Sequence, residues 1–221
     1  MLPYLYSFRR CPYAIRARYT IALLACQVRL REVSLKAKPE ALLALGGPST
    51  VPQWLDEKGN RLSESWDIMQ WAIIRSEKKE LADQLWPKAQ RERARILAWV
   101  KYNDGRFKYW LDRYKYADRY PEMDEIFYRN KAEIFLRRLN SRLSQSNYIL
   151  SNKISLADIA IFPFIRQFSL VNRVWFADSD YKCVKKWLDS FIEDIFFKDE
   201  VMRKLPFWQN GQKELVFPFC Q

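Results

Sequence analysis

Histidine is absent from the 221-residue sequence, and its absence removes several classes of chemistry. Catalytic triads with a histidine base and most zinc or iron sites depend on an imidazole ring. We therefore expect no metal site. The remaining chemistry favours a side chain that activates itself, such as a thiol.

Cysteines are few, and their spacing shows no pairs. This pattern argues against a disulfide framework and for a reducing, cytoplasmic compartment. No run of about 18 uncharged apolar residues occurs, so we expect no membrane span. The first residues lack the basic region and apolar run of a signal peptide, and we expect none. The four cysteines are Cys11, Cys26, Cys183 and Cys220.

The formal net charge of +12 raises the question of an anionic partner. Nucleic acid, an anionic membrane and an anionic small substrate all fit such a charge. However, basic and acidic residues alternate along the chain, as in residues 133–138, and no run of five like charges occurs. We favour a solvated surface, with part of the excess serving an anionic substrate, over nucleic acid or a membrane.

The residues around Cys11 predict a strand, a tight turn and a helix. An extended apolar stretch precedes Ser7-Phe8-Arg9-Arg10-Cys11-Pro12, and an amphipathic stretch over residues 15–26 follows. Proline is tolerated at the first helical position. The unpaired N–H groups of a helix start favour thiolate over thiol, and so do the two arginines. Cys11 is therefore a candidate nucleophile; the alternative is a small buried apolar residue.

The first 76 residues alternate between strand and helix patterns. A strand-helix-strand unit this short implies a parallel pair with a right-handed crossover. The turn with Gly59 predicts a hairpin. The order βαβαββα predicts an α/β domain with a mixed four-stranded sheet. Strands are expected over residues 2–8, 28–35, 52–55 and 61–63, and helices over 12–25, 38–45 and from 64 onward.

The rest of the chain is helical in pattern, so we predict an all-helical domain over residues 89–221 behind a polar linker over 77–88. Ser155 and Asp158 form a capping pattern at the start of one helix. The tail from residue 206 is aromatic and irregular. Further helices are expected over 89–116 (as one helix or two, with Gly105 at a bend), 121–144, 181–196 and 198–205.

The arrangement resembles the cytosolic glutathione transferase superfamily. Cys11-Pro12-Tyr13-Ala14 is similar to the Cys-Pro-Phe-Ala of the omega class, and to the Cys-Pro-Tyr-Cys of glutaredoxins with the second cysteine replaced. The resemblance covers the whole chain and is specific in the first domain. It implies a thioredoxin-like first domain over residues 1–76, glutathione as co-substrate and a homodimer.

The resemblance also implies roles for individual residues near the thiol. Cys11 matches the catalytic thiol of the cysteine-type members. Val51-Pro52 matches a pair with a cis proline, in which the residue before proline offers its backbone to the cysteinyl unit of glutathione. Such a ligand adds itself to an exposed backbone segment. Tyr13 packs beside the thiol.

Three further residues match the two ends of the glutathione site. Glu64-Ser65 resembles the pair that holds the γ-glutamyl end, where the glutamate meets the ammonium group. The serine and the helix start can hold the carboxylate. Lys38, which precedes a proline, matches the omega-class lysine that meets the glycine carboxylate.

Ala14 occupies the position of a second cysteine, so the sequence predicts a glutathione-dependent thioltransferase with a single thiol. Cys11 would take a glutathionyl group from a small disulfide or a glutathionylated substrate, and a second glutathione would release it. One alternative is a detoxifying transferase that conjugates glutathione to electrophiles through Tyr4, Tyr6 or Ser7. Another is a non-catalytic interaction protein of the same superfamily.

A co-substrate pocket is expected to include aromatic residues of the second domain. The alternative is that these rings belong to the core, because aromatic residues at helical spacing are often buried. The candidates are Tyr102, Phe107, Trp110 and Trp175.

Overall fold

The computed structural model describes residues 1–47 and 49–219, which form two compact units. One unit comprises Met1–Asp83 together with Asp194–Gln221, and the other comprises Gln84–Glu193. The C-terminal segment therefore groups with the first unit, whereas we expected it to complete the helical domain. The expected linker over residues 77–88 contains a short helix, α4 (Lys79–Leu85).

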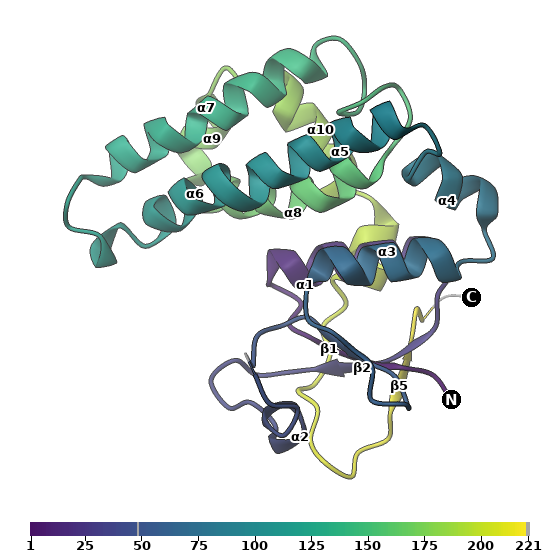
Figure 1. The fold of residues 1–221 in the computed structure, drawn as a ribbon. Coiled ribbons are helices and arrows are strands. Elements are labelled where there is room, and N and C mark those ends of the chain that lie inside the picture. The colour runs from purple at the N-terminus through teal and green to yellow at the C-terminus, as the bar shows by residue number, and fades with distance from the viewer. Residues whose placement is uncertain (48, 220–221) are drawn as a thin grey trace. The chain divides into compact units, whose positions relative to one another are not determined.

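The first unit is built on a mixed sheet with the order β4-β3-β1-β2-β5 (Figure 1). β1 and β2 are parallel, and every other neighbouring pair is antiparallel. The predicted thioredoxin-like fold class is confirmed, but the sheet has five strands instead of four. The strands are β1 (Tyr4–Ser7), β2 (Val28–Glu32), β3 (Gln53–Leu55), β4 (Arg61–Leu62) and β5 (Leu215–Phe217).

Three helices cover the two faces of this sheet. α1 (Pro12–Leu23) and α3 (Ser65–Arg75) lie side by side on one face, and α2 (Glu40–Leu43) lies on the other (Figure 1). Leu5 of β1 pairs with Leu30 of β2, and both side chains are fully buried. This apolar centre fixes the position of β1, and so of the loop that leaves β1 and leads to Cys11.

The C-terminal segment is tied to the first unit by polar and aromatic contacts. The backbone N–H of Trp208 donates to the carbonyl of Glu32 at 2.7 Å. The Arg31 guanidinium lies 4.0 Å from the ring centroids of both Tyr4 and Trp208, and it pairs with Glu214. Such cation–π contacts are stabilising when partly desolvated. They explain why a segment with an irregular local pattern adds a strand to β2.

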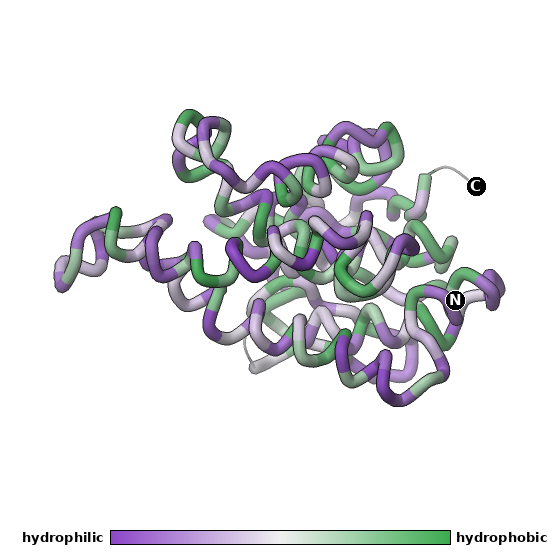
Figure 2. The backbone as a smooth tube through the Cα atoms, turned by 90° about the horizontal axis from the view of Figure 1, so that it is seen from above, coloured by the Kyte–Doolittle hydropathy of each residue, from purple (hydrophilic) through white to green (hydrophobic). Residues whose placement is uncertain are grey.

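The second unit consists of helices joined by turns and loops, and none of its described residues forms a strand. α5 (Gln90–Tyr102) and α6 (Lys108–Lys115) are joined by a π-helical turn, Asn103–Phe107, which includes the predicted bend position Gly105. Apolar and polar positions alternate around the helices (Figure 2), as amphipathic packing requires. The other helices are α7 (Glu125–Leu143), α8 (Leu156–Ser169), α9 (Arg173–Asp178) and α10 (Lys182–Ile192), with a 3-10 turn at Ala117–Arg119.

The capping pattern predicted at the start of α8 is present. Asp158 is fully buried and accepts hydrogen bonds from the backbone N–H groups of Ser155 and Ile149 and from Nε1 of Trp187. A buried carboxylate with these partners fixes the helix start. Within the described part of the chain, no helix is both long and apolar enough to cross a membrane.

Candidate functional site

Cys11 stands at the start of α1, directly after the loop that leaves β1. Its N–H donates to the Phe8 carbonyl at 2.9 Å, and its own carbonyl accepts from Ile15 at 2.9 Å. Cys11 is therefore the N-cap of α1, with Pro12 at the first helical position. The predicted strand, turn and helix are all present, so the half-buried thiol sits beside the positive end of a helix dipole.

The thiol faces the loop that precedes β3. Cys11 Sγ donates to the Val51 carbonyl at 3.6 Å, a distance that the larger sulfur radius permits. The Val51-Pro52 peptide bond is cis, as the resemblance implies. Two segments 40 residues apart in sequence therefore meet at the thiol.

A pocket of about 440 Å³ opens beside Cys11 and is lined by eleven residues of the first unit. All seven residues that the sequence analysis assigned to the glutathione site line it. Of the four that it missed, three lie within two positions of an assigned residue, and Leu35 lies in the loop that follows β2. The lining residues are Cys11, Tyr13, Leu35, Lys38, Ser49, Thr50, Val51, Pro52, Ser63, Glu64 and Ser65.

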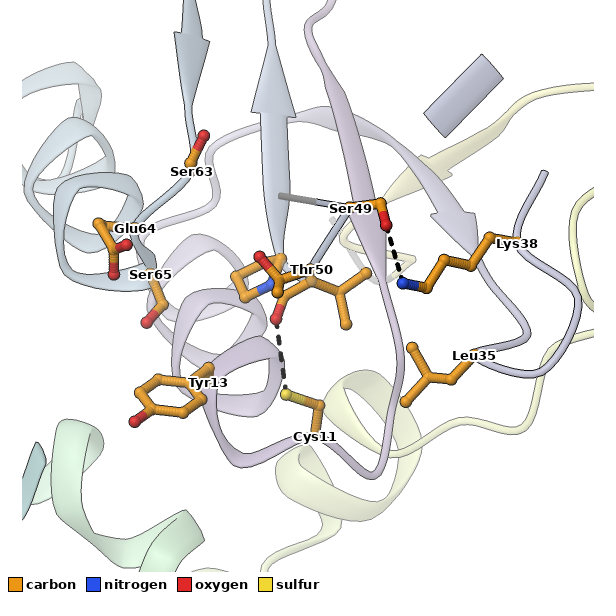
Figure 3. A pocket seen from close by; sticks show the side chains of 11 residues that line it. Cys11, Tyr13, Leu35, Lys38, Ser49, Thr50, Ser63, Glu64 and Ser65 are labelled. Carbon is orange, nitrogen blue, oxygen red and sulfur yellow. Dashed lines mark hydrogen bonds between the residues drawn. The ribbon is translucent and has the colours of Figure 1, made fainter. Parts of the chain in front are cut away.

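The pocket has two polar ends with the thiol between them (Figure 3). At one end, Lys38 Nζ donates to Ser49 Oγ at 2.9 Å. At the other end, Glu64 is the N-cap of α3 and Ser65 is its first residue. A cation at one end and a helix start at the other can each hold a carboxylate.

Buried charged residues support the loop before Cys11, and the sequence analysis did not identify them. Glu32 accepts from the Arg9 N–H at 2.7 Å and from Arg18 at 3.0 Å. Both side chains of this ion pair are almost fully buried. Burial raises the pKa of Glu32 above its usual value, and burial lowers the pKa of Arg18 to about 10. The pair fixes the backbone two residues before the thiol.

The aromatic candidates for the co-substrate pocket all belong to the helical unit. Phe107 is 1% exposed and stacks on Phe135 at 4.6 Å between centroids, so it is a core residue. The other three, Tyr102, Trp110 and Trp175, are less completely buried. Their assignment to a co-substrate pocket stays a proposal.

The remaining cysteines occupy different surroundings from Cys11. Cys26 is buried, and its thiol donates to the Ala72 carbonyl at 3.4 Å. Burial raises the pKa of Cys26 to about 11. Cys183 is half-buried on α10, and Cys220 lies outside the described residues. Among the described residues no group of three or more cysteines and acids is arranged to hold a metal ion.

We predict a selective reaction with iodoacetamide at pH 7–8. The thiolate is the reactive form, and a pKa of about 11 leaves Cys26 almost entirely protonated. Cys11 should be alkylated within minutes, whereas Cys26 should react only above about pH 10 or after unfolding. Peptide mass mapping over a pH series measures this order, and a Cys26 that reacts first at neutral pH would contradict it.

Comparison with known families gives two matches. The family described as "Glutathione S-transferase, N-terminal domain" matches residues 5–80, and "Glutathione S-transferase, C-terminal domain" matches residues 128–190. The chain belongs to the glutathione S-transferase family. The predicted superfamily and the prediction of an enzyme of this family are confirmed.

Solved structures of low sequence identity share the fold. A glutathione S-transferase from Methylobacillus flagellatus KT with GSH bound is 22% identical, with a TM-score of 0.76 over 89% of this chain and 98% of that one. A family member from Pseudomonas fluorescens Pf-5 with two glutathione molecules bound is 20% identical, with a TM-score of 0.71 over 88% and 89%. The unclassified glutathione S-transferase 2 from Bombyx mori is 18% identical, with a TM-score of 0.73 over 87% and 88%.

Proposed function

We propose that this protein is a cysteine-type glutathione transferase, similar to the omega class, that acts as a glutathione-dependent thioltransferase. The observation that carries the proposal is the position of the Cys11 thiol in one pocket between Lys38 at one end and the start of α3 at the other. Glutathione is a tripeptide with a carboxylate at each end and a thiol in between. Two of the structural relatives contain glutathione, which supports the same ligand for this chain.

Each part of glutathione has a counterpart in the pocket. Glu64 pairs with the ammonium group of the γ-glutamyl unit, and Ser65 with the start of α3 binds its carboxylate. The backbone of Val51 holds the cysteinyl unit beside the thiol, and Lys38 holds the glycine carboxylate. Tyr13 flanks the thiol.

The reaction consists of two thiol–disulfide exchanges. The Cys11 thiolate attacks the glutathionyl sulfur of a mixed disulfide, the S–S bond breaks, and the substrate leaves as a thiolate that takes a proton. A glutathione thiolate then attacks the glutathionyl sulfur on Cys11, releasing glutathione disulfide and regenerating the Cys11 thiolate. With alanine at position 14, the second step depends on glutathione itself.

The environment of the alternative activating residues favours this reaction over conjugation. Tyr4 and Tyr6 accept hydrogen bonds from Arg29 and Arg31, and burial raises the pKa of Tyr6 above its usual value. The Ser7 hydroxyl is fully buried. Tyr4, Tyr6 and Ser7 are not among the described residues that line the pocket. We also propose that the protein is a cytoplasmic homodimer, as the resemblance to the superfamily implies.

The decisive experiment is a mass spectrum of the intact protein after incubation with glutathione disulfide. One glutathionyl group should be added, peptide mapping should place it on Cys11, and reduced glutathione should remove it. Turnover of hydroxyethyl disulfide should exceed turnover of chlorodinitrobenzene, which reports conjugation.

Two outcomes would redirect the assignment. Rapid conjugation of chlorodinitrobenzene without any adduct on Cys11 would favour the detoxifying transferase. A failure to bind immobilised glutathione would favour a non-catalytic member of the family.

A further inference from the structure

Arg10 is an exposed cation next to the thiol, and the proposed contacts with glutathione do not use it. It directly precedes Cys11 in the loop between β1 and α1. The Arg9 N–H of this loop donates to Glu32 at 2.7 Å. The Cys11 N–H donates to the Phe8 carbonyl at 2.9 Å. Since consecutive Cα atoms lie about 3.8 Å apart, this fixed loop keeps the backbone of Arg10 at a defined place beside the thiol.

The side chain of Arg10 lies over an aromatic ring that belongs to the same cluster as the thiol. Its guanidinium is 5.3 Å from the ring centroid of Phe8. Phe8 and Cys11 both pack against a group of buried apolar residues that includes Val51, whose carbonyl accepts from the thiol. A cation–π contact favours one position of a long side chain, so the positive charge is held in the neighbourhood of the thiol.

The proposed binding of glutathione leaves this charge without a role. Lys38 meets the glycine carboxylate of glutathione, and Glu64 with the start of α3 meets the γ-glutamyl end. Among the residues that the structure describes, no carboxylate forms an ion pair with Arg10. The charge of Arg10 is therefore available to the other half of a mixed disulfide, the thiol that leaves when Cys11 takes the glutathionyl group.

The leaving thiol develops negative charge beside this cation. The Cys11 thiolate attacks the glutathionyl sulfur, the S–S bond breaks, and the leaving thiol departs as a thiolate that then takes a proton. A carboxylate a few bonds from that sulfur adds a second negative charge to the same group. Because the Debye length at physiological ionic strength is about 8 Å, a cation next to Cys11 acts on such a group with limited screening.

We propose that Arg10 is a specificity-determining residue that selects mixed disulfides whose leaving thiol carries a carboxylate near the sulfur. The inference rests on the proposed function, because it concerns the second substrate of the same thiol. Arg10 acts on this substrate through its charge and takes no part in the exchange of sulfur atoms.

The test compares three mixed disulfides of glutathione that differ in the charge of the leaving thiol. The leaving thiols are 3-mercaptopropionate, 2-mercaptoethanol and cysteamine, in which a two-carbon chain joins the sulfur to a carboxylate, a hydroxyl or an ammonium group. The value of kcat/KM for each disulfide is measured at low salt with the wild type and with each variant. The compounds differ in intrinsic reactivity, and the ratio of variant to wild type for each compound cancels that difference.

Arg10→Gln should lower kcat/KM about threefold to fivefold for the anionic substrate, change it less than about 1.5-fold for the neutral one and raise it about twofold for the cationic one. Arg10→Lys, which keeps the charge, should stay within about 1.5-fold of the wild type on all three. Sodium chloride at about 0.5 M should remove most of the difference between the wild type and Arg10→Gln, because salt screens exposed charges. The control variant, Arg75→Gln, removes an exposed arginine of α3 and should change none of the ratios.

Two results would overturn the inference while the proposed function stands. One is a set of unchanged ratios in Arg10→Gln. The other is an equal loss on all three substrates, because the attacked glutathionyl sulfur is common to them and an equal loss would show an effect on the Cys11 thiol alone. A wild type that turns over none of the three disulfides would overturn the proposed function itself.

Circular dichroism melting accompanies each variant, and the exposed position of Arg10 predicts a stability close to that of the wild type. If Arg10→Gln does not fold, the salt dependence of the wild type decides the question. Added salt should then lower kcat/KM for the anionic substrate and raise it for the cationic one. Parallel changes for both substrates would overturn the inference.

Discussion

Replacement of Cys11 by serine is expected to reduce the turnover of a glutathionyl mixed disulfide to the uncatalysed background, roughly 10³-fold or more below the wild type. A serine hydroxyl cannot form the mixed disulfide through which both exchange steps pass. The substitution changes one atom, and that atom lies in the pocket beside the Val51 carbonyl.

The same substitution should leave the fold intact, which makes the result unambiguous. Cys11 is the N-cap of α1, and serine is among the preferred residues at that position. The thermal midpoint of Cys11→Ser should therefore equal or exceed that of the wild type. Glutathione binding should persist, because the two ends of the pocket are unchanged.

The control is Cys183→Ser on α10, which should keep full turnover. Steady-state kinetics with hydroxyethyl disulfide and glutathione measures both variants. Full activity in Cys11→Ser would exclude the thiol mechanism. Loss of activity in Cys183→Ser alone would move the nucleophile to the helical unit.

Truncation of Glu32 to alanine should lower the free energy of unfolding by about 3–5 kcal/mol. The variant leaves Arg18 as an uncompensated buried cation and removes the acceptor for the Arg9 N–H. Replacing both charged residues, as in the Arg18→Met/Glu32→Leu double variant, should regain most of the lost free energy of unfolding, because two apolar side chains leave no buried charge.

Urea denaturation of the single and double variants measures these differences. Glu77→Ala, which truncates an exposed acid of the same unit, should stay within about 0.5 kcal/mol of the wild type. A loss below about 1 kcal/mol in Glu32→Ala would show that the buried pair does not hold this loop.

The pKa of Glu32 adds a pH dependence with a defined sign. Because burial raises that pKa, the folded protein keeps this proton at pH values where the unfolded chain has released it. The contribution of Glu32 to stability is thus greatest at acidic pH and falls as the pH rises through the raised pKa. Glu32→Gln does not titrate, so its deficit against the wild type should shrink toward pH 7. A deficit that grows with pH would contradict this.

Much of the first unit follows from local sequence patterns. The strand, turn and helix around Cys11 depend on an apolar run, a proline at a helix start and helical periodicity. The hairpin at Gly59 and the capping box of Ser155 and Asp158 depend on residues a few positions apart. Those features were predicted because the residues that form them are only a few positions apart in the sequence.

The site itself was predicted only in part. Seven of the eleven residues that line the pocket were named from a resemblance to a family, and the structure places all seven around one cavity. Ser49, Thr50 and Ser63 were missed although they lie within two positions of named residues, and Leu35 was missed because its place depends on the path of the loop after β2.

By itself, the sequence determined which thiol stands at a helix start, since a cysteine before proline at the end of a strand-turn pattern is recognisable from its neighbours. Only the tertiary structure decided that the C-terminal tail returns to β2 as a fifth strand, and that Arg16, Arg18 and Glu32 are buried. Strand pairing between segments more than 180 residues apart and the burial of charges both depend on partners distant in sequence. Local sequence patterns do not identify such distant partners. A charged residue in an amphipathic helix or strand is ordinarily solvated, so the sequence alone predicts exposure for these three residues.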